Sequence, residues 1–197
     1  MKNKNLAIVI LAAGKSSRMG DETKQLLKYK EETLLKIASK KALKISNAVY
    51  VVLGHDFELC QDEIKDLDVN IIYNKDFEKG IGSSISCAVS KLNDYENIMI
   101  TLCDQPFIST EHLNSLKKHI DNKTIISTIY ENSKNATVPA IFPKKYFNEL
   151  MKLNEDIGAR NLLNKEVSIK TKLEKNQSVD IDTPKDVSIF LNIQLSK

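Results

Sequence analysis

The sequence predicts an α/β fold in which a mainly parallel, mixed sheet carries helices on both faces. Short apolar runs rich in β-branched residues alternate with segments of helical periodicity along the 197 residues. A strand, a helix and a second strand in sequence form a right-handed crossover between parallel strands. The first run, residues 6–11, is wholly apolar, as in a strand buried on both faces. The length fits one domain over residues 1–197.

Each expected element follows from its local pattern. Strands are placed where apolar β-branched residues run together, and helices where apolar residues recur three or four positions apart. The expected strands span residues 6–11, 48–53, 69–73, 98–102, 124–129, 137–142 and 167–173. The expected helices span the segment around 34–45 and residues 57–65, 83–92, 111–120, 145–153, 159–164 and 184–191. Because ligands bind beyond the carboxyl ends of such strands, functional residues are expected just after positions 11, 53, 73 and 102.

Charge and cysteine content argue against several classes of protein. The 29 basic and 26 acidic residues give a net charge of +3, without a run of five like charges, so nucleic-acid and membrane binding have no support. The apolar start imitates a short signal segment, but no window approaches the roughly 20 apolar residues of a membrane span. Three cysteines without C-x-x-C spacing favour neither a disulfide framework nor a zinc site. A cytoplasmic location is expected.

The strongest local signal is the segment that follows the first strand, residues 11–27. Its small residues let backbone N–H groups approach a triphosphate, and three cations can neutralise the phosphate charge. Those cations are Lys15, Arg18 and Lys24. Arg18 is one of only two arginines in the chain, which favours a position that needs a planar fork. The segment matches neither G-x-G-x-x-G nor the P-loop pattern, and a purely structural turn is the alternative interpretation.

Two aspartates are candidates for a functional role, and the position of Asp104 indicates a metal ligand. Asp104 directly follows the apolar run 98–102, which places its carboxylate at the ligand end of a strand, where Mg²⁺ can face phosphates. The alternative role as a helix cap is better filled by Ser109 or Thr110. Thr183 is expected to cap the next helix with Pro184 at its first position, which leaves Asp182 free for another role. A structural role for Asp182 stays open.

Other polar residues have two interpretations each. Gly80, Ser83 and Ser84 open an expected helix; they either contact ribose or base, or form a turn and a cap. Arg160 either binds an acceptor phosphate or carboxylate, or pairs with Asp156. His112 is interpreted as a solvated helix residue, and Cys103 as a buried core thiol.

Five segments resemble motifs of the molybdenum cofactor nucleotidyltransferases, within the wider group of nucleotide-sugar-type pyrophosphorylases. The family pattern L-A-A-G-x-S-x-R-M-G followed by K-x-L-L matches residues 11–27. The segments 80–85, Cys103-Asp104-Gln105-Pro106, 156–160 and 180–186 match further motifs in the family's order. The resemblance covers essentially the whole chain and implies a Rossmann-like fold of the nucleotide-diphospho-sugar transferase type.

The resemblance also implies an activity, with a site. It implies transfer of a cytidylyl group from CTP to molybdopterin with Mg²⁺, and a molybdenum hydroxylase as the recipient of the product. Lys24, Arg18 and Asp104 would be catalytic, Asp104 and Asp182 metal ligands, and Arg160 an acceptor contact. The nucleotide would be bound by Leu11, Ala12, Ala13, Gly14, Lys15, Ser16, Arg18, Lys24, Gly80, Ser83 and Ser84. The cytidylyl branch is favoured by Ala12-Ala13-Gly14, where the guanylyl branch resembles L-A-G-G.

One segment departs from the family pattern and keeps other functions open. Thr137-Val138-Pro139 stands where relatives often have Gly-His-Pro or Gly-Pro-Pro, which affects the acceptor side. The alternatives are a cytidylyltransferase for a small sugar or polyol phosphate, and a guanylyltransferase of the same family. A nucleotide-binding partner that delivers cofactor to a molybdenum hydroxylase is the non-enzymatic alternative.

Overall fold

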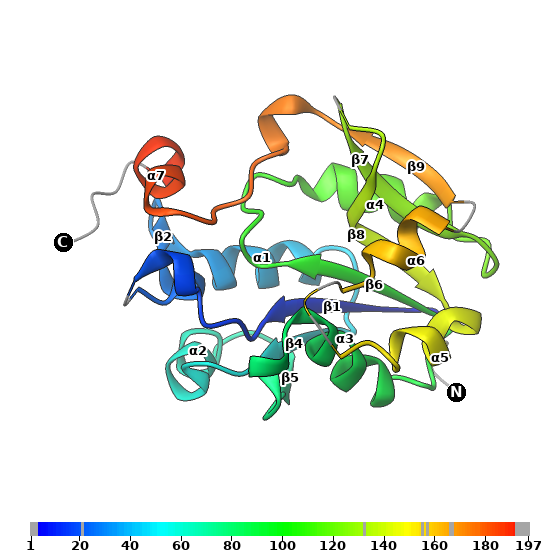
Figure 1. Cartoon of the computed structure of the whole chain (residues 1–197), viewed down its shortest axis with the longest axis horizontal. Coiled ribbons are helices and arrows are strands. Elements are labelled where there is room, and N and C mark those ends of the chain that lie inside the picture. Colours follow the sequence, from blue (N-terminus) through cyan, green and yellow to red (C-terminus); the bar gives the residue numbers. More distant parts are fainter. Residues whose placement is uncertain are drawn as a thin grey trace.

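A computed structural model gives the fold of residues 4–191, apart from 21, 132, 155, 157, 166 and 167. In this described part, seven strands form one sheet in the order β5-β4-β1-β6-β8-β7-β9 (Figure 1). The strands are β1 (Leu6–Ala12), β4 (Val49–Leu53), β5 (Asn70–Tyr73), β6 (Asn97–Leu102), β7 (Ile125–Tyr130), β8 (Ala136–Pro143) and β9 (Ser168–Leu173). Neighbours pair in parallel, except that β8 runs antiparallel to β6 and β7. The predicted mixed, mainly parallel sheet is confirmed.

Helices cover both faces of the sheet because β1 buries its side chains on both sides. Leu6, Ile8 and Ile10 belong to a core shared with α1 (Leu34–Leu43), α2 (Phe57–Glu63) and α4 (Thr110–Lys118). Val9 and Leu11 face a second core shared with α3 (Ile81–Ser90), α5 (Phe147–Leu150) and α6 (Arg160–Lys165). Each fully buried aliphatic side chain contributes about 1.5–3 kcal/mol, which fixes the strand at the centre of the sheet.

Side-chain caps begin three helices at the expected kind of residue. The hydroxyl of Thr33 accepts a hydrogen bond from the backbone N–H of Lys36, and Ser109 accepts one from His112 N–H, each at 3.1 Å. Thr183 and Asp186 cap each other's backbone N–H groups at the start of α7 (Pro184–Asp186). The caps predicted at Ser109 and Thr183 are therefore confirmed, and Asp104 is left free of that role.

The structure differs from the predicted elements at several places. The helix expected at 145–153 is a short 3₁₀ turn, η4 (Lys144–Tyr146), followed by α5. After α7 the chain continues as a π-helical segment, η6 (Val187–Leu191). A two-stranded hairpin, β2 (Lys28–Tyr29) and β3 (Glu32–Thr33), was not predicted. Residue 167, with which the last strand was expected to begin, lies outside the described residues.

His112 contradicts its interpretation as a solvated residue. Its side chain is buried against the sheet, with Nε2 2.9 Å from the Thr128 hydroxyl. The Thr128 hydroxyl donates its one proton to the carbonyl of Pro139 at 2.8 Å, so Nε2 of His112 carries the proton that they share. Burial lowers the pKa of His112, which keeps the ring neutral.

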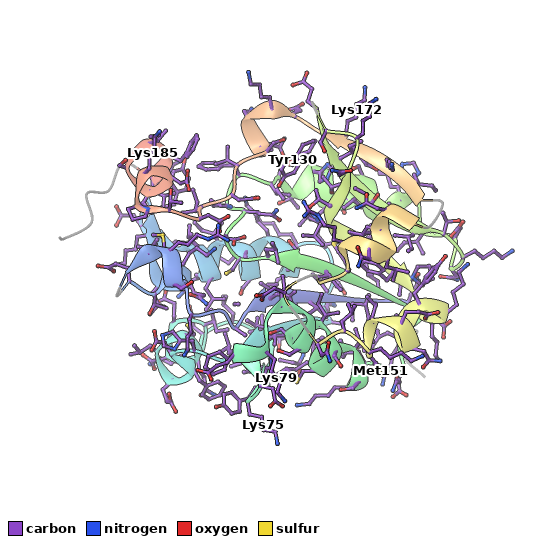
Figure 2. The ribbon with its side chains drawn as sticks, in the orientation of Figure 1. Lys75, Lys79, Tyr130, Met151, Lys172 and Lys185 are labelled. Atoms are coloured by element: carbon purple, nitrogen blue, oxygen red, sulfur yellow. The ribbon has the colours of Figure 1, made fainter. Side chains whose placement is uncertain are left out.

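The surface is rich in lysine, as Lys75, Lys79, Lys172 and Lys185 show at the periphery of Figure 2. None of the helices in the described part of the chain combines the length and the apolar character that a membrane span requires.

Candidate active site

A cavity of about 520 Å³ lies at the carboxyl ends of β1 and β6. It is bounded by the segment after β1, by η3 (Phe77–Lys79) with the start of α3, and by the end of β6. The predicted nucleotide-binding residues that line it are Leu11, Ala12, Ala13, Gly14, Lys15, Ser16, Arg18, Lys24, Gly80 and Ser84. Both predicted metal ligands, Asp104 and Asp182, line it as well.

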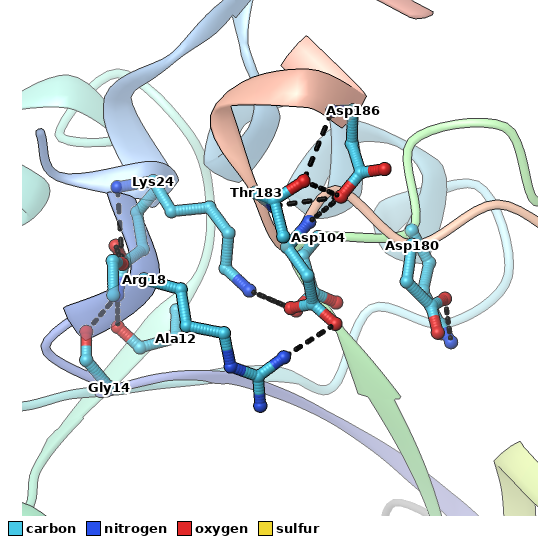
Figure 3. A network of polar contacts seen from close by, with 12 residues as sticks. Ala12, Gly14, Arg18, Lys24, Asp104, Asp180, Thr183 and Asp186 are labelled. Atoms are coloured by element: carbon cyan, nitrogen blue, oxygen red, sulfur yellow. Dashed lines mark hydrogen bonds and ion pairs between the residues drawn. The ribbon is translucent and has the colours of Figure 1, made fainter. Parts of the chain in front are cut away.

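Lys24 lies at the centre of the charged residues in this cavity (Figure 3). Its ammonium is 2.6 Å from Asp104 Oδ2 and 2.9 Å from Asp182 Oδ1. Arg18 approaches the other oxygen of Asp182, with a nitrogen to oxygen distance of 3.6 Å. Burial alone would lower the pKa of Lys24, but the charge and hydrogen bond of Asp104, with the hydrogen bond of Asp182, raise it above its ordinary value. Lys24 is therefore a permanent cation.

Asp104 has one oxygen without a hydrogen-bonding partner. Its side chain is 15% exposed, and Oδ1 is buried without a hydrogen bond from any described residue. Burial raises the pKa of Asp104, and the ammonium of Lys24 acts against that rise. A buried carboxylate oxygen that lacks a donor is costly unless something else binds it. Cys103, beside it in the chain, is buried in the core as predicted.

Asp182 reaches the cavity from a distant part of the sequence. The backbone N–H of Ile181 donates to the Asp104 carbonyl at 2.9 Å, which fastens the C-terminal segment to the end of β6. The Asp182 and Thr183 N–H groups donate to Asp186 Oδ2 at 3.2 and 2.8 Å. These bonds hold Asp182 beside Lys24, opposite Asp104.

The two aspartates fit a magnesium ion that also binds substrate. In the described ranges, no cluster of three or more His, Cys, Asp or Glu side chains is placed to hold a metal by itself. Mg²⁺, however, is often bound by one or two carboxylates while phosphates and water complete its octahedral shell. Asp104 and Asp182 share one ammonium, and Asp104 Oδ1 has no donor. These donors match such a shared site.

The residues that directly follow β4 and β5 support the loop after β1 and the start of α3, and they do not line the cavity. The His55 N–H donates to the Ala13 carbonyl at 3.1 Å. A Cβ at Gly54 would lie 2.6 Å from Phe77 Cβ, so only glycine allows this close approach. Asn74, which the sequence analysis did not single out, is buried and donates to both serine hydroxyls of α3, Ser83 and Ser84, at 3.0 Å each.

Ser83 and Arg160 lie apart from the first cavity. The Ser83 hydroxyl contacts the carbonyls of Asp76 and Gly80 at 2.9 and 2.8 Å, and Ser83 is absent from the lining residues. Arg160 lines a second cavity of about 590 Å³. Residue 157, in the middle of the predicted motif at 156–160, lies outside the described residues.

The second cavity adjoins the first and is mostly apolar. The two share Leu11, Ile81, Leu102 and Asp156. Further apolar walls come from Ile85, Ile100, Ala136, Val138, Ala159 and Leu163. Its polar lining includes Asp180, whose Oδ1 accepts hydrogen bonds from Gln105 and Tyr130 at 3.0 Å each. The departing segment at Thr137 and Val138 also lines this cavity.

Gln25 is a residue of the first cavity that the sequence analysis passed over. It is 2% exposed and its amide contacts the loop after β1. The only signal in the sequence is its place in the segment Lys24-Gln25-Leu26-Leu27, where the family pattern leaves this position variable.

Known proteins are similar to this chain over most of its length. The model of the MobA-like NTP transferase domain matches residues 8–171. The purine catabolism protein PucB of Bacillus subtilis is 31% identical over 206 residues, which cover 94% of this chain and 96% of PucB. The bifunctional protein GlmU of Aliarcobacter butzleri is 32% identical over 126 residues, or 64% of this chain. The matched part is only 28% of that GlmU.

Solved structures share the fold at lower sequence identity. Rv0371c from Mycobacterium tuberculosis H37Rv has a TM-score of 0.87 at 23% identity and covers 98% of this chain and 100% of that one. Its complex with manganese has a TM-score of 0.83 at 20% identity, with the same coverage. These likenesses support the fold.

Proposed function

The chain belongs to the MobA-like NTP transferase family, and from this premise we propose that it transfers the cytidylyl group of CTP to a terminal phosphate of molybdopterin. As a family member it is a nucleotidyltransferase. The observation that carries the proposal is the Lys24 ammonium held between Asp104 and Asp182, beside the small-residue loop after β1.

The chemistry we propose needs alignment and charge neutralisation more than a protein nucleophile. An oxygen of the acceptor phosphate attacks the α-phosphorus of CTP and forms a new P–O bond. The bond from the α-phosphorus to the oxygen that bridges to the β-phosphorus breaks, and that oxygen leaves with the electron pair as pyrophosphate. Lys24 and Arg18 stabilise the negative charge that develops on the α-phosphate and the leaving group.

Asp104 and Asp182 are the residues we propose to hold Mg²⁺. The free Oδ1 of Asp104 supports this role, as does the manganese complex of the structural relative Rv0371c. A bound Mg²⁺ supplies neutralisation of phosphate charge. The Lys24 ammonium already lies between the two carboxylates. When the metal and the nucleotide bind, it would give up part of its contact with these carboxylates and contact phosphate oxygens instead.

We propose that the nucleotide base is bound and selected between the loop after β1 and the start of α3. Ala13 carries a methyl group where a guanylyl enzyme would have glycine, which reduces the room for a purine ring. Ser84 lines the cavity, with Gly80 beside it, whereas the Ser83 hydroxyl already contacts two carbonyls. Backbone groups near Ala12 and the Ser84 hydroxyl are therefore the proposed contacts to the cytosine edge.

The acceptor is proposed to occupy the second cavity. Its apolar walls suit a flat organic body, and Arg160 at its rim suits an anionic group. The shared wall at Leu11 and Leu102 lets such an acceptor extend its phosphate toward Lys24 and Asp104. We propose a molybdenum hydroxylase as the recipient of the resulting cytosine dinucleotide.

Pyrophosphate release tests the proposal. The purified protein is incubated with each nucleoside triphosphate, Mg²⁺ and either molybdopterin or a small sugar or polyol phosphate. We expect release with CTP and molybdopterin, and a kcat/KM for CTP at least about tenfold above that for GTP, within the range that a mismatch in a pocket provides. A preference for GTP would indicate the guanylyl alternative, and release only with a sugar or polyol phosphate would indicate that acceptor class. Nucleotide binding without turnover would indicate cofactor delivery.

A further inference from the structure

Gln25 binds the nucleotide loop at three points. Its Nε2 donates to the carbonyl of Ala12 at 2.9 Å and to that of Gly14 at 2.8 Å. Its Oε1 accepts a hydrogen bond from the Ser16 hydroxyl at 3.2 Å. The side chain is 2% exposed, so water does not replace these partners readily. One amide thus satisfies both donors and its acceptor within a five-residue stretch of backbone.

These contacts fix the direction of the loop's N–H groups. In a planar trans peptide the C=O and the following N–H point in opposite directions. The carbonyls of Ala12 and Gly14 face Gln25, so the N–H groups of Ala13 and Lys15 point away from it. The carbonyl between them, that of Ala13, is held by the His55 N–H. Three successive peptide groups are therefore held in place before any ligand binds.

Gln25 also connects this loop to the neighbouring cation, Lys24. The Ser16 hydroxyl that donates to Gln25 accepts from the Lys24 backbone N–H at 3.2 Å. Ser16 itself has a φ of 56°, a left-handed conformation that is costly for a residue with a side chain. The hydrogen bonds around Gln25 hold that conformation and set the distance between the loop and Lys24.

We propose that Gln25 is a positioning residue for nucleotidyl transfer. In this role Gln25 orients the N–H groups of the loop toward the phosphates and fixes the position of Lys24 relative to those N–H groups. Gln25 itself contacts neither substrate. Binding groups that are already oriented lower the ordering cost of the transition state. The inference rests on the proposed function, because it assumes that this loop takes the triphosphate.

One variant with a matched control separates positioning from simple stability. Gln25→Met keeps the length and volume and removes all three hydrogen bonds. Gln61→Met, on the exposed side of α2, is the matched control. Kinetics are measured well below the Tm of each protein, with the folded fraction checked by circular dichroism. We expect Gln25→Met to raise the KM for CTP and lower kcat by about tenfold each, with the acceptor KM changed less than about twofold.

A purely structural role predicts a different result. Gln25→Met would then lower the Tm while the folded enzyme kept the kcat and CTP KM of the Gln61→Met control, and that outcome overturns the proposal. Wild-type protein that binds no CTP in calorimetry would remove the proposed cytidylyl transfer and this inference together. Wild-type protein that binds CTP while Gln25→Met binds it equally well removes only the inference.

A second variant gives a pH signature. Gln25→Glu can donate a hydrogen bond to the loop only while its carboxyl is protonated, and burial raises the pKa of a carboxyl. The CTP affinity of Gln25→Glu, divided by that of wild type at the same pH, should therefore fall as the pH rises from about 5 to 8. A ratio that stays flat, or an affinity equal to that of wild type at pH 8, contradicts the proposed role.

Discussion

The two cavities of the site differ in how their polar groups are held. In the first, Lys24 and Arg18 pair with two aspartates, and every carbonyl from Ala12 to Gly14 accepts a hydrogen bond. The second has mostly apolar walls, with Arg160 exposed at its edge. Under the proposed function, the first would bind the triphosphate, and the second would bind the acceptor, which varies between nucleotidyltransferases. Damage to the two should therefore appear in different kinetic constants.

The largest effect is expected in the first cavity from Asp104→Asn. The amide keeps the shape but loses the charge that we assign to metal binding, so kcat should fall about 10³-fold or more while the fold survives. Pyrophosphate release at saturating substrates measures it. Asp94→Asn, which removes a surface partner of Lys4, is the control. Near-normal turnover in Asp104→Asn would remove the metal assignment.

The second largest effect is expected from Lys24→Met, also in the first cavity. Its cation is expected to contact charge that grows in the transition state, so kcat should fall about 10²-fold and the KM for CTP should change less. Steady-state kinetics with varied CTP measure the two constants. Lys40→Met, which breaks a surface pair with Glu32, should leave both unchanged. If only KM changes, Lys24 is a ground-state contact and the difference between the cavities is smaller than we infer.

Arg160→Met tests the second cavity. We expect the acceptor KM to rise about tenfold, the order of a lost charged hydrogen bond, with kcat and the CTP KM within about twofold of wild type. Kinetics with varied acceptor at saturating CTP measure this. Lys152→Met, another exposed cation, is the control. If Arg160→Met lowered kcat as much as Lys24→Met does, Arg160 would not act in acceptor binding alone, and the two cavities would not have the separate roles that we propose.

His112 gives the smallest expected effect, and it concerns stability alone. Its folded pKa lies below the ordinary value of 6.5, so the unfolded chain binds a proton that the folded state resists, and stability falls as the pH drops below about 6.5. Thermal melts at pH 7.5 and 5 should show a smaller acid-induced loss in Tm for His112→Gln than for wild type. His119→Gln, exposed at the end of the same helix, should leave the loss unchanged.

The difference between the two cavities also explains why the sequence predicted the first better than the second. The strands follow from local apolar runs. Lys15, Arg18 and Lys24 follow one such run and Asp104 follows another, and because the carboxyl ends of parallel strands lie at the same edge of a sheet, their meeting there could be predicted. The second cavity draws its walls from β6, β7, β8, α3 and α6. Ordinary aliphatic residues supply most of these walls, and no spacing in the sequence identifies them. The sequence marked this cavity only through the rare Arg160, the motif segments 156–160 and 180–186, and the departing segment at Thr137-Val138-Pro139.

One residue, His112, was misjudged and another, Gln25, was missed, for different reasons. His112 stands beside Leu113 and four positions before Leu116, both buried, so the helical period did place it toward the core, and its polar character was given too much weight. Gln25 had no such signal. Its contacts to residues 12 and 14 depend on the turn η2 (Lys24–Leu26), which brings the chain back under the loop, and a three-residue turn leaves no periodic pattern.

The C-terminal segment also bears on the order in which the site is made. Ile181, Val187 and Leu191 form an apolar cluster with Met19 and Leu27, and Ile181 is hydrogen-bonded to Asp104. A chain emerging from the ribosome presents Lys24 and Asp104 long before Asp182. The second carboxylate is therefore the last of these three groups to be synthesised, with residues 180–191. A nascent chain stalled before residue 180 is expected to bind CTP more weakly than the released protein.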